Sequence, residues 1–131
     1  EIHILAQNLR VHEFKSAGPV FTMGATGDSL YVASGSAVDI VLSLAGKQPK
    51  RLASFAPGTV FGEMAMLGGH PRSADAVLLG PGTVWELSRE TLGTLEQDHP
   101  AIAQTILRNI GKSLADRLRL TTTELRLALE G

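Results

Sequence analysis

The sequence predicts a mainly β fold with C-terminal helices: an antiparallel β-roll, similar to a jelly-roll barrel, followed by a long final helix. Short β-prone segments separated by glycine turns recur roughly every eight to twelve residues up to residue 87, which is typical of sandwiches and barrels. The period then changes, because Ile102, Ile106 and Ile110 recur at helical spacing. A chain of 131 residues, 44% of them hydrophobic, is expected to form one domain with a real core.

The composition excludes several classes of function. With 12 basic and 13 acidic residues the net charge is −1, so no strong field draws the chain onto nucleic acid or an anionic membrane. The absence of cysteine excludes disulfides, thiol catalysis and Cys-type zinc sites. No apolar run approaches the roughly 20 residues of a membrane span. We expect a cytoplasmic domain that by itself contacts neither nucleic acid nor membrane, although the missing part of the chain could tether it to a membrane protein.

The N-terminal residues are predicted to be helical. Ile2 and Leu5 share one face of a helix within residues 1–10, and Glu1 already lies inside that pattern. We therefore expect a helix truncated at its start and a domain cut from a longer protein. The first strand is predicted from Leu9 to Phe14.

The next segments alternate between β-prone runs and turns. Gly18-Pro19 is predicted to be a turn, and Gly24–Asp28 a tight connection whose glycines accept positive φ. Ser29–Ala33 and Ser36–Leu44 flank the turn signal Ser34-Gly35, so they are predicted to form a hairpin.

A second hairpin is predicted from Ala74–Leu79 and Thr83–Leu87, joined by the turn at residues 80–82. The remaining predicted strands are Val20–Met23, Arg51–Phe55 and Val60-Phe61. The β-roll is thus expected over residues 11–87 and the C-terminal helices over residues 88–131.

Two helices are predicted in the last third. Ser88 can cap a helix from Arg89 to about Glu96, and Pro100 suits the first position of a second helix that runs to about Leu129. The apolar stripe of this second helix, which continues to Leu114 and Leu118, is expected to pack on the roll or on a second copy in a homodimer. Glycine at position 111 destabilises the interior of this helix by about 1 kcal/mol relative to alanine, so a kink or a close packing contact is predicted there.

The segment from Phe61 to Ala76, FGEMAMLGGHPRSADA, predicts an anion pocket. Gly62 ends a strand and precedes good helix formers, whose unpaired backbone N–H groups attract anions. Pro71 stiffens the return of the chain, so Arg72 can direct its planar guanidinium at the same point. A plain surface ion pair between Glu63 and Arg72, worth about 0 to 1 kcal/mol, is the simpler interpretation.

FGEMAML followed by PRSADA resembles the phosphate-binding cassette of the cyclic nucleotide-binding domain family. GDSLYVASG at residues 27–35 and PGTVFGE at residues 57–63 are similar to other segments of that family, whose fold is a β-roll. The resemblance implies that Glu63 accepts a hydrogen bond from the ribose 2′-hydroxyl. It also implies that Arg72, Ser73 and backbone amides of residues 62–65 hold the cyclic phosphate. The candidate ligand-binding residues are Phe61, Gly62, Glu63, Met64, Ala65, Arg72, Ser73, Arg117 and Thr121.

Arg117 and Thr121 complete this set from the last helix. They are four residues apart and share a helix face, so a guanidinium could stack on the purine while a hydroxyl meets its edge. The helix would then act as a lid over the base.

The sequence thus predicts a regulatory module, not an enzyme, that binds cyclic AMP in preference to cyclic GMP. It would transmit occupancy through its last helix to a fused effector, such as a transporter, channel or enzyme, missing from this fragment. A degenerate interaction domain of the same fold that binds no nucleotide is the alternative, and a phosphodiesterase is a distant third. No catalytic cofactor is expected. The four histidines lie in different elements, so no metal site is expected either.

Overall fold

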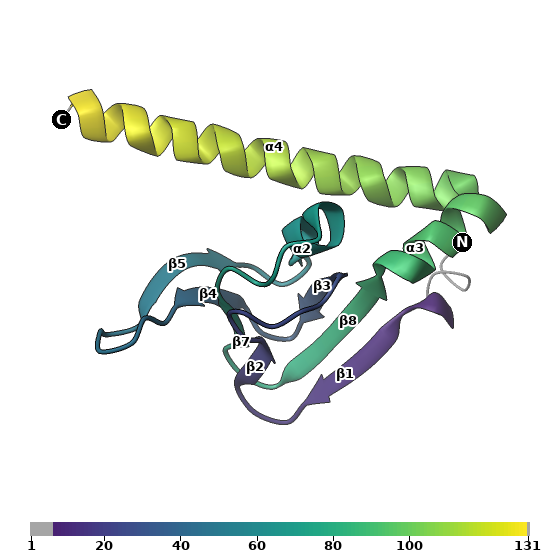
Figure 1. Ribbon diagram of the computed structural model, residues 1–131, viewed down its shortest axis with the longest axis horizontal. Helices are drawn as coiled ribbons and strands as arrows, with labels where there is room; N and C mark the ends of the chain where they lie inside the picture. The colour runs from purple at the N-terminus through teal and green to yellow at the C-terminus, as the bar shows by residue number, and fades with distance from the viewer. Residues whose placement is uncertain (1–6, 131) are drawn as a thin grey trace.

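A computed structural model describes residues 7–130, without the side chain of Leu67. Two antiparallel sheets of four strands each form the roll, and two C-terminal helices follow it (Figure 1). The predicted mainly β fold with C-terminal helices is confirmed. The elements are β1 (Arg10–Phe14), β2 (Gly18–Phe21), β3 (Ser29–Ser34), β4 (Val38–Leu42), β5 (Lys50–Phe55), β6 (Val60–Phe61), α2 (Glu63–Gly68), β7 (Asp75–Leu78), β8 (Gly82–Ser88), α3 (Arg89–Asp98) and α4 (Pro100–Glu130). Of the predicted N-terminal helix, Gln7 and Asn8 are helical, and residues 1–6 lie outside the described part.

The strand order is β1-β8-β3-β6 in one sheet and β2-β7-β4-β5 in the other. Both predicted hairpins are therefore wrong: β3 and β4 lie in different sheets, as do β7 and β8. The two connections cross between the sheets side by side. A Cβ on Gly82 would lie 2.2 Å from the carbonyl oxygen of Ser34, and one on Gly35, whose φ is 89°, would lie 3.0 Å from the Gly82 Cα. Glycine here allows two backbones to approach closely, and it does not mark a two-residue hairpin.

The predicted turn at Gly18-Pro19 is also wrong, because both residues belong to β2. Strand β2 is at an edge of its sheet and pairs only with β7 among the described strands. Proline lacks a backbone N–H, and an edge strand tolerates this because one side of it has no partner. The register shifts between Pro19 and Phe21, as expected of a bulge.

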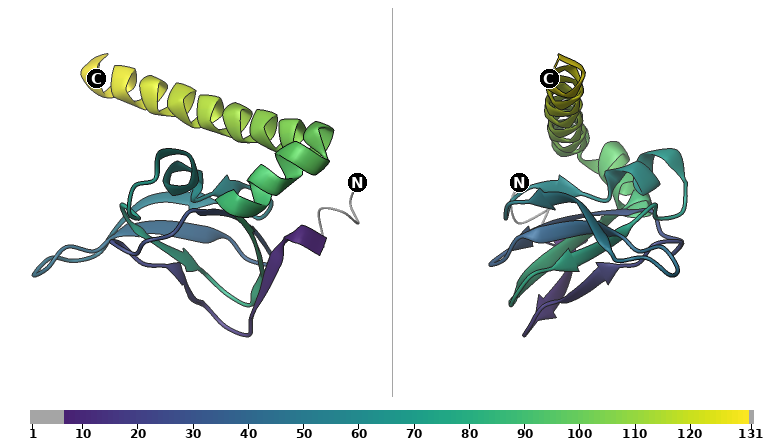
Figure 2. Two further views of the ribbon diagram at one scale, coloured as in Figure 1. Left: turned by 45° about the vertical axis from the view of Figure 1, so that its right-hand side comes forward. Right: turned by 90° about the vertical axis from the view of Figure 1, so that its left-hand side faces the viewer.

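The hydrophobic core has two layers. One lies between the sheets and contains Ala33, Val38, Phe61, Ala76, Leu78 and Val84. The other joins the roll to the cassette helix and the C-terminal helices, and contains Leu30, Met66, Leu87, Leu92, Leu95, Ala103 and Ile110. Since residues alternate between the two faces of β3 and β8, each strand contributes to both layers. The second layer anchors the start of α4 to the roll. Figure 2 shows that α4 leaves α3 beside the roll and then extends away as a single long helix.

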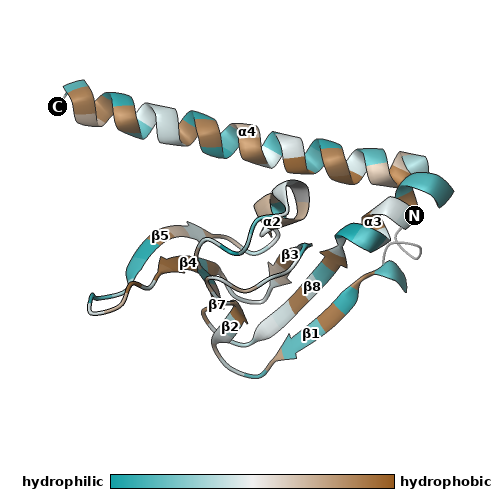
Figure 3. Cartoon of the chain, in the orientation of Figure 1, coloured by the Kyte–Doolittle hydropathy of each residue, from teal (hydrophilic) through white to brown (hydrophobic). Residues whose placement is uncertain are grey.

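Helix α4 begins at the predicted Pro100 and is continuous to Glu130. Ile102 and Ile110 are buried, but the stripe loses its cover further on, and Leu118 is 69% exposed. Hydrophobic residues nevertheless recur along the whole helix (Figure 3). A Cβ on Gly111 would meet nothing within 4 Å, so the predicted close contact is not made within residues 7–130. In that described part, no helix has the length and apolar character needed to cross a membrane.

Candidate functional site

The residues predicted to form an anion pocket come together where β6 turns into α2. Gly62 makes the turn with φ 79° and ψ 5°, the left-handed region. A Cβ at this position would lie 3.0 Å from Arg72 Nη1 and 3.1 Å from Tyr31 Cδ2. Glycine is therefore required twice, for its φ and for the close approach of the guanidinium. Helix α2 ends at the glycine pair Gly68-Gly69, with Gly69 left-handed at φ 69°.

Arg72 points at this turn, as the sequence predicts. Its side chain is buried (5% exposed), with Nη1 donating to the carbonyl oxygen of Gly62 at 2.7 Å and Nη2 to that of Ser29 at 2.8 Å. Its Cζ lies 4.3 Å from the centroid of the Phe21 ring. The ion pairs found among the described residues do not include Arg72. Arg72 is thus a buried cation whose hydrogen-bond partners are neutral carbonyl groups.

Glu63 is paired with Arg117 and not with Arg72. The carboxylate is 2% exposed, and its Oε1 accepts a hydrogen bond from Arg117 Nη1. Arg117 Nη2 donates to the carbonyl oxygen of Val60, and its Cζ lies 4.4 Å from the centroid of Phe55. The simpler interpretation, a surface pair between Glu63 and Arg72, is therefore wrong. No hydrogen bond from a described residue reaches Glu63 Oε2, which leaves an acceptor for a ligand.

A cavity of about 360 Å³ collects most of the predicted site residues. Gly62, Glu63, Met64, Ala65, Arg72, Ser73 and Arg117 line it, together with Phe21, Ile40, Phe55, His70, Pro71 and Ala74. Phe61 is not in this lining, because its side chain is buried between the sheets. It stacks on Tyr31, with ring centroids 5.6 Å apart. Phe61 therefore lies behind the cavity wall, next to Phe21, with the two ring centroids 6.3 Å apart.

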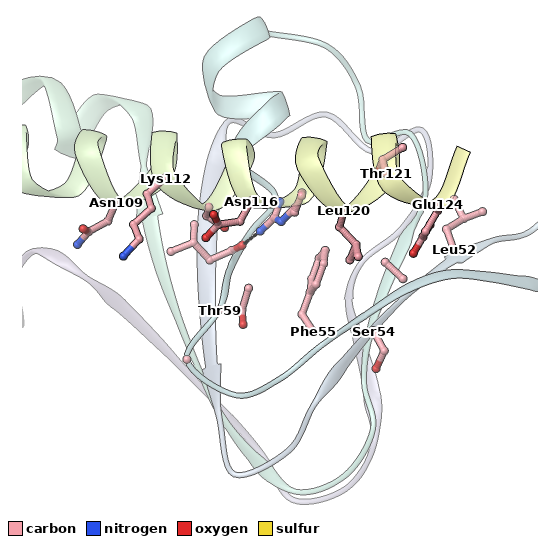
Figure 4. A pocket seen from close by; sticks show the side chains of 15 residues that line it. Leu52, Ser54, Phe55, Thr59, Asn109, Lys112, Asp116, Leu120, Thr121 and Glu124 are labelled. Carbon is pink, nitrogen blue, oxygen red and sulfur yellow. Dashed lines mark hydrogen bonds between the residues drawn. The ribbon is translucent and has the colours of Figure 1, made fainter. Parts of the chain in front are cut away.

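Thr121 lies in a neighbouring groove of about 840 Å³ between α4 and β5. Phe55 and Arg117 line both spaces, so the groove continues from the cavity. Figure 4 shows Asn109, Asp116 and Leu120 of α4 facing Phe55 and Thr59 of the roll. The structure therefore brings Arg117 into the cavity and leaves Thr121 beside it.

Sequence reasoning missed the residues that support Arg72. Phe21 and Tyr31 surround its guanidinium, and Ser29 accepts from it. Burial of the Tyr31 hydroxyl, followed by the negative charge of Glu86, raises the pKa of Tyr31 above 10.0, against the opposing influence of Arg72. These residues come from strands far away in the chain. Ser29 and Tyr31 lie in the family-like segment at residues 27–35, but nothing in that segment pairs them with Arg72. Among residues 7–130, no group of three His, Asp or Glu side chains could hold a metal ion.

Comparison with known proteins agrees with this geometry. The model of the cyclic nucleotide-binding domain matches residues 11–99. The chain belongs to the cyclic nucleotide-binding domain family. This family is regulatory and typically not catalytic. The match covers both sheets, the cassette and α3.

Two curated relatives and one solved structure illustrate the family. The cyclic AMP receptor protein of Thermus thermophilus is 35% identical over 109 residues, which are 83% of this chain and 49% of that protein. Glutaminase 1 of Bradyrhizobium diazoefficiens is 32% identical over 108 residues, 82% of this chain and 17% of the relative. The chain thus spans half or less of these relatives. A cyclic nucleotide-binding domain from Methylobacillus flagellatus superposes with a TM-score of 0.84 at 25% identity, covering 94% of this chain and 69% of that one.

Proposed function

We propose that this domain binds a cyclic nucleotide, with the cyclic phosphate on Arg72. The observation that carries the proposal is the buried guanidinium of Arg72, which has no carboxylate partner among the described residues. A buried charge is costly unless an opposite charge compensates it. A cyclic phosphodiester supplies one negative charge, and the adjoining cavity of about 360 Å³ offers space for it. Ser73 and the backbone amides of residues 62–65 would complete its hydrogen bonds.

The ribose would lie against Glu63. Its 2′-hydroxyl can donate to Oε2, while Oε1 keeps its hydrogen bond from Arg117. Met64, which is 73% exposed at the cavity, would cover the sugar from the cassette side. In this arrangement the carboxylate faces the sugar and avoids the phosphate.

The base would extend towards α4, where Arg117 offers a planar cation for stacking and Thr121 a hydroxyl. We expect cyclic AMP to bind more tightly than cyclic GMP, as the name of the Thermus relative suggests. Ser73, however, could serve guanine as well as phosphate. A tenfold preference for cyclic GMP in titrations would contradict this expectation.

Transmission of the signal would use α4, because Arg117 ties this helix directly to Glu63 in the cassette. Relatives such as the glutaminase are several times longer than the matched region, so we expect a fused effector here too. The exposed leucines beyond residue 117 would pair with a second copy in a homodimer. Deleting residues 116–131 should weaken nucleotide binding but leave the roll folded, and amide exchange in α4 should slow when ligand is added. A truncated domain that binds as tightly as the whole chain would contradict a role of α4 as a lid.

Calorimetric titration with cyclic AMP, cyclic GMP and AMP tests the proposed function. Arg72→Ala should weaken binding of the preferred nucleotide by roughly 2 to 5 kcal/mol, since the buried phosphate loses its counter-charge. Arg119→Ala is the matched control, because the Arg119 side chain is 77% exposed on α4. The alternative, a degenerate interaction domain, predicts no binding of any cyclic nucleotide. Binding by Arg72→Ala within threefold of wild type would place the phosphate elsewhere.

A further inference from the structure

A half-buried carboxylate outside the cavity has both of its oxygen atoms engaged. Glu86 of β8 accepts a hydrogen bond at Oε1 from His12 Nε2 of β1, at 2.7 Å, and at Oε2 from Ser29 Oγ of β3, at 2.6 Å. Because a carboxylate only accepts, Nε2 of His12 carries the proton in this pair. Glu86 is thus held from the strands on both sides of β8.

Ser29 connects this carboxylate to the proposed phosphate site. Its side chain donates to Glu86, and its own carbonyl oxygen accepts from Arg72 Nη2 at 2.8 Å. Ser29 is buried and is the first residue of β3, directly after the connection at residues 24–28. A continuous chain of hydrogen bonds therefore runs from the surface at His12, through Glu86 and Ser29, to the guanidinium.

The surroundings keep Glu86 charged. Burial by itself raises the pKa of Glu86, but the hydrogen bonds from Ser29 and His12 and the charges of His12 and Arg10 outweigh it, so the pKa lies below its ordinary value of 4.5. An ionised acceptor makes a stronger hydrogen bond than a neutral one. Ser29 is therefore held firmly at its hydroxyl, which restrains the peptide that bears its carbonyl.

We propose that Glu86, acting through Ser29, is a positioning residue that orients the Arg72 guanidinium for the phosphate. The proposal rests on the function proposed above. The Arg72 guanidinium donates to two backbone carbonyls, and the carbonyl of Gly62 belongs to the cassette that the ligand itself would contact. The Ser29 carbonyl is the anchor outside the cassette. Its position fixes the plane in which the two nitrogen atoms present their remaining hydrogens to an anion.

The test compares cyclic AMP binding by wild type, Glu86→Ala, Ser29→Ala and Glu86→Gln. Loss of the acceptor or of the hydroxyl should weaken binding about three- to tenfold, the contribution of one hydrogen bond. Glu86→Gln keeps a neutral acceptor for Ser29, whose hydrogen bond is weaker than that of the carboxylate but is not lost, so binding should fall by less than in Glu86→Ala and stay within about twofold of wild type. In the free proteins, NMR should show separate, slowly exchanging Arg72 Nη signals in wild type and Glu86→Gln, and averaged signals in the two alanine variants.

Thr83→Ala is the matched control. It removes the 3.0 Å hydrogen bond from Thr83 to Glu13, which joins β1 and β8 at the end of this strand pair away from Glu86. Cyclic AMP affinity and the Arg72 signals should not change in this variant. Thermal melts establish whether each variant is folded. If Glu86→Ala is unfolded, the result for Ser29→Ala alone decides.

Two results separate this inference from the proposed function. If wild type binds no cyclic nucleotide but its Arg72 signals still depend on Glu86, the proposed function fails and the positioning network stands. If wild type binds, but Glu86→Ala and Ser29→Ala leave the Arg72 signals or the affinity unchanged, the positioning role is overturned.

Discussion

Arg117→Ala should destabilise the free protein through Glu63. The substitution removes the partner of a carboxylate that is 2% exposed, together with the hydrogen bond to Val60 and the contact with the Phe55 ring. Breaking a buried ion pair from one side costs about 3 to 5 kcal/mol. The Arg117 side chain is 29% exposed, so water replaces part of the lost interaction and we expect roughly 2 to 4 kcal/mol.

The assay is thermal and urea unfolding without ligand, followed by the fluorescence of Trp85, the single tryptophan. For a domain of this size the loss corresponds to a melting temperature lower by roughly 8 to 16 °C. Arg119→Ala, on the same helix but 77% exposed, should change the stability by less than about 0.5 kcal/mol.

A double-mutant cycle identifies the partner. In a Glu63→Gln background the removal of Arg117 no longer leaves a buried carboxylate unpaired, so Arg117→Ala should cost less there by at least about 1 kcal/mol. An equal cost in both backgrounds would show that Arg117 stabilises α4 by its contact with Phe55 alone. A single variant that melts within about 2 °C of wild type would refute the reasoning altogether.

Three further predictions concern the rest of the chain. The folded pKa of Glu86 lies below 4.5, so its charge stabilises the fold above that pH, and this stabilisation is lost as the pH falls through the folded pKa. The difference in melting temperature between wild type and Glu86→Gln should therefore shrink from pH 7 to pH 3. A constant difference would contradict this. Gly82→Ala should lower the free energy of unfolding in urea by at least about 2 kcal/mol, because its Cβ would lie 2.2 Å from the Ser34 carbonyl oxygen. Gly93→Ala in α3, where a Cβ meets nothing within 4 Å, should instead raise it by up to about 1 kcal/mol. Equal stabilities of the two variants would argue against the close crossing of the two connections. Leu118→Asp should convert a dimer to a monomer in sedimentation without lowering the melting temperature of the roll; a monomeric wild type would contradict pairing through α4.

Local signals in the sequence predicted the elements well and their partners poorly. Ser88 caps α3 as predicted, with its hydroxyl accepting from the Thr91 N–H at 3.1 Å, and Pro100 begins α4. Glycine, however, is ambiguous, because it serves a tight hairpin and a close crossing equally well. At Gly35 and Gly82 the sequence predicts the first, and the structure contains the second.

In the candidate site, too, the local contact was predictable from the sequence and the contacts between distant residues were not. Arg72 reaches Gly62 because α2 ends at the glycine pair and the chain turns back, and the glycines and Pro71 that indicate this return are local signals in the sequence. The partner of Glu63 was not, because Arg117 is 54 residues further on and any of the surrounding cations could have taken that place. Ser29 contributes its carbonyl group, which every residue has, so no side-chain pattern could reveal it.

By itself, the sequence determined that the chain is a β-roll with helices at its end, that the turn at Gly62 would face an arginine, and that neither cysteine chemistry nor a strong net charge would contribute. These conclusions depend on local geometry, periodicity and composition, which short segments of the chain carry. Only the tertiary structure decided which sheet each strand joins, which cation neutralises Glu63, and that Ser29 is hydrogen-bonded to both Glu86 and Arg72. Those features depend on contacts between distant residues, whose energies become defined when the two sheets and α4 have packed together.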